Sequence, residues 1–443
     1  MPFDSSSLCP LHAGCHDAST RTEWRISVFD LLSSLSEVTD WISSELTYHH
    51  RQVAYLAWNI GEEVGLSSGD LDDLVMAALV HDIGAISLKE RLETLDFELT
   101  TGLEHAEQGY LLLRRFEPLA RAAVLTRYHH LPWQNAQGEE NKGNHVPIGS
   151  HILQLADRIA VLIDRRTEIL GQVARVQGAI EPCAGFLFKP ELVDAFHRRS
   201  VQEALWLDLV SPSLEKTLRR VVPLKTLNVD IDGLLRLGNL LRCIIDFRSP
   251  FTATHSTGVA ETASSLAEFM KLPEQTCRLL RVAGFIHDLG KLGVPTEILE
   301  KPGKLTTEEF QMIRHHPYGS IRALEAVSDL REITAWGALH HERMDGSGYP
   351  FHLFAGKLPL EARIMAVADV FTAITENRPY RSGMEPSRVK SILQGMTTSL
   401  DQVVVEVLIG HYELIDQARR TAQQSSIDEY KGFLAGLGQS HSR

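Results

Sequence analysis

The chain reads LLRVAGFIHDLGK over residues 279–291 and DLVMAALVHDIGA over residues 73–85. In both stretches apolar residues recur three and four positions apart, which is the spacing of a buried helix face, and the run ends at an adjacent His-Asp pair. Helical spacing continues over most of the chain from Thr22 onward, whereas the alternation typical of strands is nearly absent. The sequence therefore predicts an all-α fold in which two helices each end by presenting a histidine and an aspartate.

These two pairs belong to a repeat of seven side chains that are all potential metal ligands. From the first His to the His-Asp pair is 32 residues in both copies, and from the third His to the His-His pair is 24 in both. A repeat at this distance indicates two copies of one domain. The first copy comprises His49, His81, Asp82, His105, His129, His130 and Asp157, and the second comprises His255, His287, Asp288, His316, His340, His341 and Asp369.

The chemistry of these ligands predicts two ions in the second copy. Neighbouring residues on a helix point about 100° apart, so His287 can serve one ion while Asp288 bridges two, because only a carboxylate has two oxygens. His255 and Asp369 would complete one ion, and His316, His340 and His341 the other. This mixture favours manganese, iron, cobalt, nickel or zinc over magnesium or calcium.

Two such ions form a centre suited to phosphoryl transfer. Lys291 lies one helical turn past His287, where it could contact a phosphate oxygen or protonate the leaving oxygen. An isolated histidine is more often a core or surface residue, and His50 and His315 are interpreted in that way. Chance does not explain the same spacing twice, so a metal centre is the preferred interpretation of both copies.

Bulk properties restrict the partners and the compartment. A net charge of −13 argues against binding a nucleic-acid polymer, but not against a small phosphate ligand beside a metal. The five cysteines are odd in number and scattered, which fits a reducing compartment. No apolar run approaches the ~18–20 residues that a membrane span needs, and the N-terminus shows no secretory pattern. We expect a cytoplasmic protein without a membrane partner.

Breakers and apolar patterns suggest how the chain is divided. We predict a flexible tail over residues 1–22, a first helical domain over 23–170, a helical connector over 171–232, a second domain over 233–425 and a C-terminal tail over 426–443. A helix near residues 231–247 carries Leu234, Leu237, Leu241 and Ile244 at a/d-like spacing. That face favours either ordinary core packing or the seam of a homodimer.

The second copy resembles the HD-GYP subgroup of the HD-domain metal phosphohydrolases over roughly residues 246–381. The resemblance is carried by RSPFTATHS at 248–256, HDLGK at 287–291, KPGKL at 301–305, HHERMDGSGYP at 340–350, ADVF at 368–371 and RPYR at 378–381. That family hydrolyses cyclic dinucleotide messengers in bacteria, chiefly cyclic di-GMP, and some members prefer the mixed guanine-adenine compound. The resemblance implies a phosphodiesterase that releases a linear 5′-phosphorylated dinucleotide.

Carried onto this sequence, the resemblance implies that all seven residues of the second copy are metal ligands, that Asp288 and Lys291 are catalytic, and that iron or manganese is favoured, with nickel, cobalt and zinc as alternatives. It implies substrate-binding roles for Arg343, Gly348, Tyr349, Pro350, Arg378 and Arg381. Some members carry a glutamate four residues before the first histidine, which supports a third metal. Phe251 stands there in this chain, so we expect two metals. Thr372 replaces an aspartate found in many members, with little effect expected on the metals.

The first copy resembles the wider HD superfamily over about residues 48–164. It keeps all seven ligand positions but lacks a Gly-Tyr-Pro loop after His129-His130, and it has Ala85 where the second copy has Lys291. Three interpretations stay open: a metallated regulatory or dimerisation domain, a second hydrolase for another phosphate compound such as the linear dinucleotide, and a metal-free relic.

The leading hypothesis for the whole chain is hydrolysis of a cyclic dinucleotide by the second domain. One alternative is a non-hydrolytic receptor that holds the messenger and signals to partners. The intact ligand set and Lys291 argue against it. The other alternative is a phosphohydrolase acting on mononucleotides, against which the Gly-Tyr-Pro loop counts in the second domain but not in the first.

Overall fold

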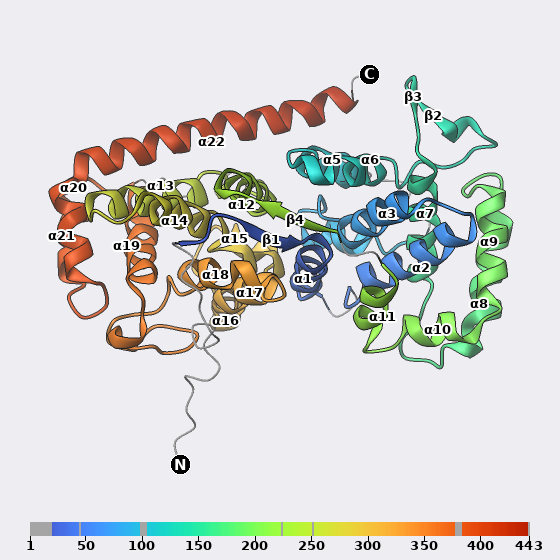
Figure 1. Ribbon diagram of the computed structural model, residues 1–443, viewed down its shortest axis with the longest axis horizontal. Helices are drawn as coiled ribbons and strands as arrows, with labels where there is room; N and C mark the ends of the chain where they lie inside the picture. Colours follow the sequence, from blue (N-terminus) through green and yellow to red (C-terminus); the bar gives the residue numbers. More distant parts are fainter. Residues whose placement is uncertain are drawn as a thin grey trace, which may run out of the picture. The chain divides into compact units, whose positions relative to one another are not determined.

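The structure is a computed structural model that describes residues 20–43, 46–97, 104–222, 225–249, 252–376 and 383–441, with the backbone alone at 439–441. The predicted all-α class is confirmed, because helices make up most of the described residues (Figure 1). The strands among those residues are short: β1 (Trp24–Ser27) lies beside β4 (Thr226–Val229), and β2 (Glu140–Asn141) pairs antiparallel with β3 (Asn144–His145).

The chain divides into two compact units, each holding one copy of the repeat. The N-terminal unit comprises residues 27–226 and 436–443, and the C-terminal unit comprises residues 1–26 and 227–435. Residues 24–26 fall in the C-terminal unit, where the Arg25 amide donates to the Asp329 carboxylate at 2.7 Å and Arg21 pairs with the same carboxylate at 2.5 Å. The sequence-based domain boundaries stay predictions.

The N-terminal unit is built around helix α2, which packs against α3 and α7. Its helices start at recognisable caps, such as the Ser67 hydroxyl that accepts the Asp70 amide at the beginning of α3. The elements are α1 (Val28–Asp40), α2 (His49–Glu63), α3 (Ser68–Val80), α4 (Leu88–Glu93), α5 (Glu104–Leu113), η4 (Glu117–Leu119), α6 (Ala120–Arg127), η5 (Gln137–Glu139), α7 (Ile148–Val161), η6 (Leu170–Gln172), α8 (Val173–Ile180), η7 (Glu181–Cys183), α9 (Pro190–Ser200), α10 (Glu203–Leu209) and α11 (Leu214–Val221).

The C-terminal unit repeats this arrangement, with α13 packed against α14 and α19. The segment predicted as a C-terminal tail, residues 426–441, continues the long helix α22 (Figure 1). The elements are α12 (Ile231–Asp246), α13 (His255–Phe269), α14 (Glu274–Ile286), η8 (Leu289–Gly293), α15 (Thr296–Leu299), α16 (Thr307–Arg314), α17 (His316–Leu324), η9 (Ser328–Leu330), α18 (Arg331–Ala338), η10 (Ala355–Lys357), α19 (Leu360–Thr375), α20 (Pro386–Gly395), α21 (Gln402–Gly410) and α22 (Tyr412–His441).

A buried aspartate at the end of the preceding helix anchors the first ligand helix in both units. Asp40 ends α1 and Asp246 ends α12, each nine residues before the first ligand histidine. The Asp40 carboxylate lies 2.9 Å from the His50 Nδ1, and the Asp246 carboxylate accepts the Ser256 hydroxyl at 2.7 Å. His50, interpreted as a spectator, therefore has a structural partner.

The apolar face of α12 is part of the core of the chain. Leu234, Leu237 and Leu241 are each 1% exposed, and α12 packs against α14 within the C-terminal unit. Of the two interpretations of this face, core packing agrees with the structure. A homodimer stays a prediction, but this face of α12 does not support it.

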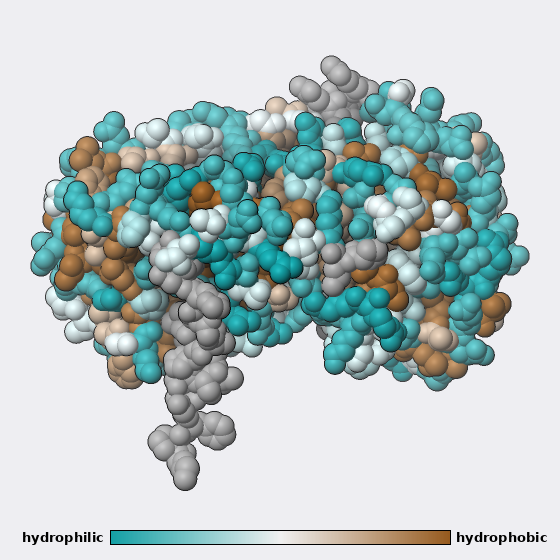
Figure 2. Space-filling model, viewed as in Figure 1, coloured by the Kyte–Doolittle hydropathy of each residue, from teal (hydrophilic) through white to brown (hydrophobic). Residues whose placement is uncertain are grey.

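On the face drawn in Figure 2, hydrophilic residues cover most of the surface and hydrophobic residues form separate patches. Within the part of the chain that the structure describes, no helix is both long enough and apolar enough to cross a membrane.

Each His-Asp pair is followed by a glycine on which another helix packs directly. A Cβ atom on Gly290 would lie 2.0 Å from the carbonyl oxygen of His316, and one on Gly84 would lie 2.1 Å from that of His105. At these distances a Cβ atom would clash with backbone, which cannot move aside as a flexible side chain can. The glycine therefore permits the third histidine to approach the His-Asp pair in both units.

We expect Gly290→Ala to destabilise the C-terminal unit by at least ~1–3 kcal/mol, the usual cost of overpacking. Chemical denaturation of the full chain measures the change. Gly395→Ala is the matched control, because a Cβ atom there meets nothing within 4 Å. Equal stability of the two variants would contradict the close packing of the His-Asp turn against α17.

Candidate metal centres

Five segments of the C-terminal unit converge on one buried point. His255 begins α13, His287 and Asp288 follow α14, His316 begins α17, His340 and His341 follow α18, and Asp369 lies within α19. His287 and His340 are fully buried, and Asp288 is 3% exposed. The structure thus brings all seven predicted ligands of this copy together.

The two carboxylate oxygens of Asp288 face two different groups of histidines. Its Oδ2 lies 3.3 Å from the Nε2 of His287 and 3.8 Å from that of His255. Its Oδ1 lies 3.2 Å from the Nε2 of His316 and 4.0 Å from that of His340. This is the placement that a bridging carboxylate requires, with one potential ion on each side.

The remaining ligands extend these two groups. Asp369 Oδ1 lies 3.3 Å from His255 Nε2 on one side, and His341 joins His316 and His340 on the other. His287 Nε2 and Asp288 Oδ1 are buried and make no hydrogen bond within the described part of the chain. Buried polar atoms are normally satisfied, so these converging atoms fit divalent cations.

Three ligand histidines are oriented by backbone carbonyls. The Nδ1 atoms of His287, His316 and His340 lie 2.7, 2.7 and 2.8 Å from the carbonyl oxygens of the residues three positions earlier in the sequence. An Nδ1–H donated to a carbonyl leaves Nε2 with its lone pair facing the centre. The local helical geometry therefore selects the tautomer that binds metal.

The protonation states also suit a metal centre. Burial lowers the pKa of His316 to about 3 and that of His341 to about 4, so both are neutral at pH 7. Burial alone would raise the pKa of Asp288, but His287 and Lys291 lower it well below its usual range. Neutral imidazoles and ionised carboxylates are the forms that bind cations.

His255 differs from the other ligands because its Nδ1 faces a carboxylate. The Nδ1 lies 3.1 Å from Oε2 of Glu376, which is 7% exposed, and Gln423 of α22 donates to the other oxygen of that carboxylate. Sequence reasoning missed Glu376 and Gln423. They could not be predicted because both are far from His255 in the sequence and neither belongs to the repeat.

Lys291 and the loop at residues 345–350 border the centre. The Lys291 ammonium lies 2.5 Å from Asp288 Oδ2. The ring of Tyr349 lies 4.8 Å from that of His341, and the guanidinium of Arg314 lies over the Tyr349 ring at 4.6 Å. Arg314 was not predicted, because the only feature that indicates a role for it in the sequence is its position two residues before His316.

The loop is held in place by its neighbours. The buried carboxylate of Glu342 accepts the amides of Phe351 and Leu353 at 2.7 and 2.9 Å, on the far side of Pro350. A Cβ atom on Gly348 would lie 2.4 Å from the backbone nitrogen of Arg343, so this close approach requires glycine. Arg343, predicted to contact substrate, donates to the carbonyl oxygen of His340 at 3.2 Å. Arg378, Arg381 and Phe251 lie outside the described residues.

The N-terminal unit brings its own seven residues together in a similar way. His81 lies 3.3 Å from Asp82 Oδ2, and His105 lies 3.3 Å from Asp82 Oδ1. His49 Nε2 lies 3.2 Å from Asp157 Oδ1. His129 and His130 complete a group with Asp82 and His105 whose potential ligand atoms lie within 4.8 Å of one another.

The surroundings of this second cluster are different. Arg158, which is 2% exposed, donates to Asp157 Oδ2 through Nη2 at 2.5 Å and through Nε at 3.1 Å. The Thr94 hydroxyl donates to Asp82 Oδ2 at 3.1 Å, on the oxygen equivalent to the one that Lys291 contacts in the other unit. Burial opposes protonation of His81, but Asp82 and Asp157 raise its pKa to about 10. The two clusters therefore contain the same types of potential ligand, but the charged and polar residues around them differ.

Comparisons with protein families identify the same two regions. Models described as HD domain match residues 239–404 and residues 46–162, which together cover more than half of the chain. A crystal structure of a cyclic GMP-AMP specific phosphodiesterase of Vibrio cholerae has the same fold, with a TM-score of 0.61 and 22% identity over 88% of this chain and 98% of that one.

Curated proteins are similar over most of the chain or over about a third of it. The 3′3′-cGAMP-specific phosphodiesterase 1 of Vibrio cholerae is 29% identical over 89% of this chain and 94% of its own length. The 3′3′-cGAMP-specific phosphodiesterase 3 of that organism is 25% identical over 84% and 92%. A cyclic di-GMP phosphodiesterase of Pseudomonas aeruginosa is 41% identical over 34% of this chain and 37% of its own length.

We expect Glu376→Gln to weaken metal retention by the C-terminal unit by roughly 10–100-fold, the usual effect of losing a group that orients a ligand histidine. Metal content after dialysis against a graded chelator measures this effect without any activity assay. Glu406→Gln on the exposed face of α21 is the control. Equal metal retention in both variants would show that Glu376 does not orient His255.

Proposed function

We propose a function from the premise that the chain belongs to the HD-domain family and carries two such domains. Its C-terminal domain is a metal-dependent phosphodiesterase that opens a cyclic dinucleotide to a linear 5′-phosphorylated dinucleotide. The observation that carries this proposal is the Asp288 carboxylate, whose two oxygens face separate histidine groups beside Lys291. The relatives support the same class of substrate.

Among cyclic dinucleotides, 3′3′-cyclic GMP-AMP is the first substrate to test. The two Vibrio relatives named for it match this chain along most of its length, including the N-terminal domain. The Pseudomonas relative named for cyclic di-GMP matches about a third of the chain. Similarity that extends over both domains favours the mixed compound as the preferred substrate.

Two divalent transition-metal ions are the proposed cofactors, with iron or manganese favoured over nickel, cobalt and zinc. His255, His287 and Asp369 would hold one ion, His316, His340 and His341 the other, and Asp288 would bridge them. Ions so held activate water at neutral pH and offset the negative charge that builds on a phosphate under attack. The N-terminal residues His49, His81, Asp82, His105, His129, His130 and Asp157 are proposed as a second metal site.

The protein's own residues have separate tasks around this centre. The Lys291 ammonium supplies a positive charge at the phosphate and is a proton donor for the leaving 3′ oxygen. Tyr349 contacts both His341 and the Arg314 guanidinium, and the rest of its ring is proposed as a contact to a base. Gly348 and Pro350 shape the rim, while Arg343, Arg378 and Arg381 are proposed as contacts to phosphate or base.

The location and assembly of the protein are parts of the same proposal. None of the three cysteines that the structure describes, Cys183, Cys243 and Cys277, is in a disulfide, which agrees with a reducing compartment such as the cytoplasm. A homodimer is retained as a proposal, and sedimentation of the full chain would test it.

Replacing Asp288 with alanine should abolish turnover of labelled 3′3′-cyclic GMP-AMP and lower the metal content, because the bridging carboxylate is lost. Chromatography of the products from anaerobically metallated protein measures the turnover. Asp232→Ala, an exposed aspartate of the same unit, is the control. A non-hydrolytic receptor would bind the compound without turnover in the wild type, and a mononucleotide phosphohydrolase would release inorganic phosphate from nucleoside monophosphates instead.

Lys291→Ala should lower kcat roughly 10²–10³-fold, the usual loss when a preorganised electrostatic contact to the reacting phosphate is removed. Metal content should remain, since the ammonium is not a ligand. Lys431→Ala on exposed α22 is the matched control for loss of a lysine. A loss of metal that parallels the loss of rate would contradict a direct role of Lys291 at the phosphate.

A further inference from the structure

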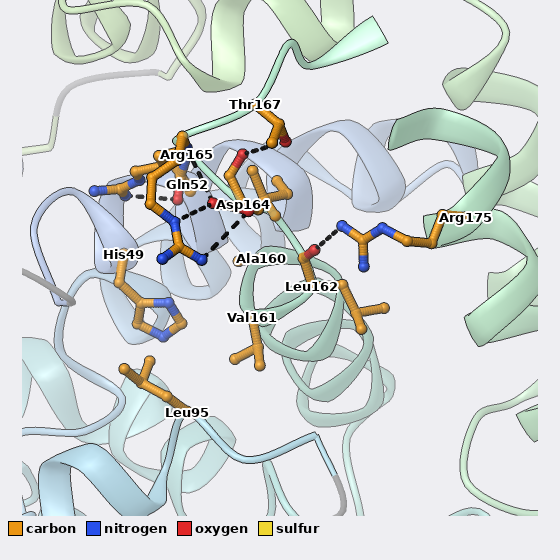
Figure 3. A pocket seen from close by; sticks show the side chains of 12 residues that line it. His49, Gln52, Leu95, Ala160, Val161, Leu162, Asp164, Arg165, Thr167 and Arg175 are labelled. Atoms are coloured by element: carbon orange, nitrogen blue, oxygen red, sulfur yellow. Dashed lines mark hydrogen bonds and ion pairs between the residues drawn. The ribbon is translucent and has the colours of Figure 1, made fainter. Parts of the chain in front are cut away.

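The N-terminal unit contains a cavity beside the first ligand of its histidine cluster. The cavity has a volume of about 850 Å³ and is lined by His49 and Gln52 of α2, by Leu95, by residues 160–167 at and after the end of α7, and by Arg175 of α8 (Figure 3). Ligand pockets in proteins span ~300–1,000 Å³. The space is therefore sufficient for a nucleotide.

The lining of this cavity is positive although the chain as a whole carries a net charge of −13. Arg165, Arg166 and Arg175 contribute three guanidinium groups. Arg166 pairs with Asp164, the single carboxylate of the lining, at 3.0 Å, so Arg165 and Arg175 are the cations that this carboxylate does not bind. A local excess of arginine favours phosphate, because the planar guanidinium binds phosphate oxygens in pairs. The charge of the cavity lining therefore favours an anionic ligand.

The wall that carries the arginines is held by several hydrogen bonds. Arg165 donates to the Gln52 side chain at 2.8 Å, and Arg175 donates to the carbonyl oxygen of Leu162 at 2.6 Å. Gln172 ties both ends of the turn, because its amide donates to the carbonyl oxygen of Asp164 at 2.7 Å and its carbonyl oxygen accepts from Arg175 at 2.9 Å. Such preorganisation reduces the entropy lost when a ligand binds.

The cavity reaches the histidine cluster itself. In Figure 3 the ring of His49 lies between Leu95 and the segment that carries Arg165. His49 is 3% exposed, and its Nε2 has no hydrogen-bond partner within the described part of the chain, although Asp157 lies 3.2 Å away. A ligand in the cavity would therefore contact the edge of the potential metal centre.

The repeat places one of these arginines, Arg166, in register with an arginine of the other domain. Arg166 follows Asp157 by nine residues, as Arg378 follows Asp369 in the RPYR segment. The lysine of the second copy is absent here, where Ala85 occupies its position. The N-terminal domain thus has an arginine at the equivalent position after its last predicted ligand and no lysine beside its His-Asp pair.

We propose that the N-terminal domain binds a small phosphate monoester of a nucleotide in this cavity, with the phosphate on the wall that carries Arg165 and Arg175. Free mononucleotides and linear 5′-phosphorylated dinucleotides share this chemistry. The proposal concerns binding by the N-terminal domain and does not depend on activity of the C-terminal one.

Equilibrium dialysis of the full chain tests the proposal with radiolabelled 5′-GMP and with a labelled linear 5′-phosphorylated dinucleotide. All proteins carry Asp288→Ala, so that the C-terminal centre is disabled throughout. Arg165→Ala combined with Arg175→Ala should remove one binding site per chain or weaken it roughly tenfold or more, since two charged contacts are lost. Arg198→Ala, an exposed arginine paired with Glu63 outside the cavity, should bind as the parent does.

Binding of either probe that is sensitive to the double variant supports the proposal, and the affinity for the two probes identifies the source of the phosphate. Arg165→Lys keeps the charge and should give an intermediate affinity. Hydrogen exchange of the unsubstituted chain provides a measurement independent of folding, with protection of residues 160–175 expected when 5′-GMP is added. Absence of binding by both probes, or binding that the double variant leaves unchanged, would overturn the proposal.

Discussion

The buried carboxylate at the end of α14 is the constraint on which the rest of the C-terminal unit depends. An ionised group without a counter-charge is costly to bury, and the Asp288 carboxylate faces His316 and His340, whose pKa values are lowered by burial. Lys291 supplies one positive charge on one oxygen, which leaves the opposite oxygen facing His316 and His340. Cations bound as proposed would supply the missing positive charge at this oxygen, and metal binding would then stabilise the folded unit.

The two domains surround similar sets of potential metal ligands with differently placed charges. In the C-terminal unit the external cation is Lys291, which touches the bridging aspartate and borders the loop that carries Tyr349. In the N-terminal unit the cation beside the potential ligands is Arg158, which is buried and donates to Oδ2 of Asp157. A buried guanidinium cannot serve a substrate, so the cations available to a ligand there are those of the cavity wall.

The sequence was sufficient to predict the parts of the structure that repeat, and insufficient for those that do not. The fold class and the convergence of the seven residues follow from helical periodicity and from spacing that recurs. The helical spacing from Thr22 onward predicts no strand at residues 24–27, yet these residues form β1, because pairing with residues 226–229 overrides local periodicity. Glu376 and Gln423 could not be found, since they reach His255 from 121 and 168 residues away in the chain. Asp40 and Asp246 did carry a usable signal, their equal distance from the first ligand histidine.

The contacts of α22 with the residues around His255 could not be predicted from local sequence patterns. Gln423 donates to Glu376 and also to the carbonyl oxygen of Thr254, the residue before the first ligand. This approach is possible because Gly258, one turn into α13, has no side chain: a Cβ atom there would lie 2.5 Å from the Gln423 amide nitrogen. A helix that is polar in composition and terminal in sequence thus becomes the outer support of a ligand histidine. The orientation of His255 depends on the docking of the last helix as much as on the helix that carries it.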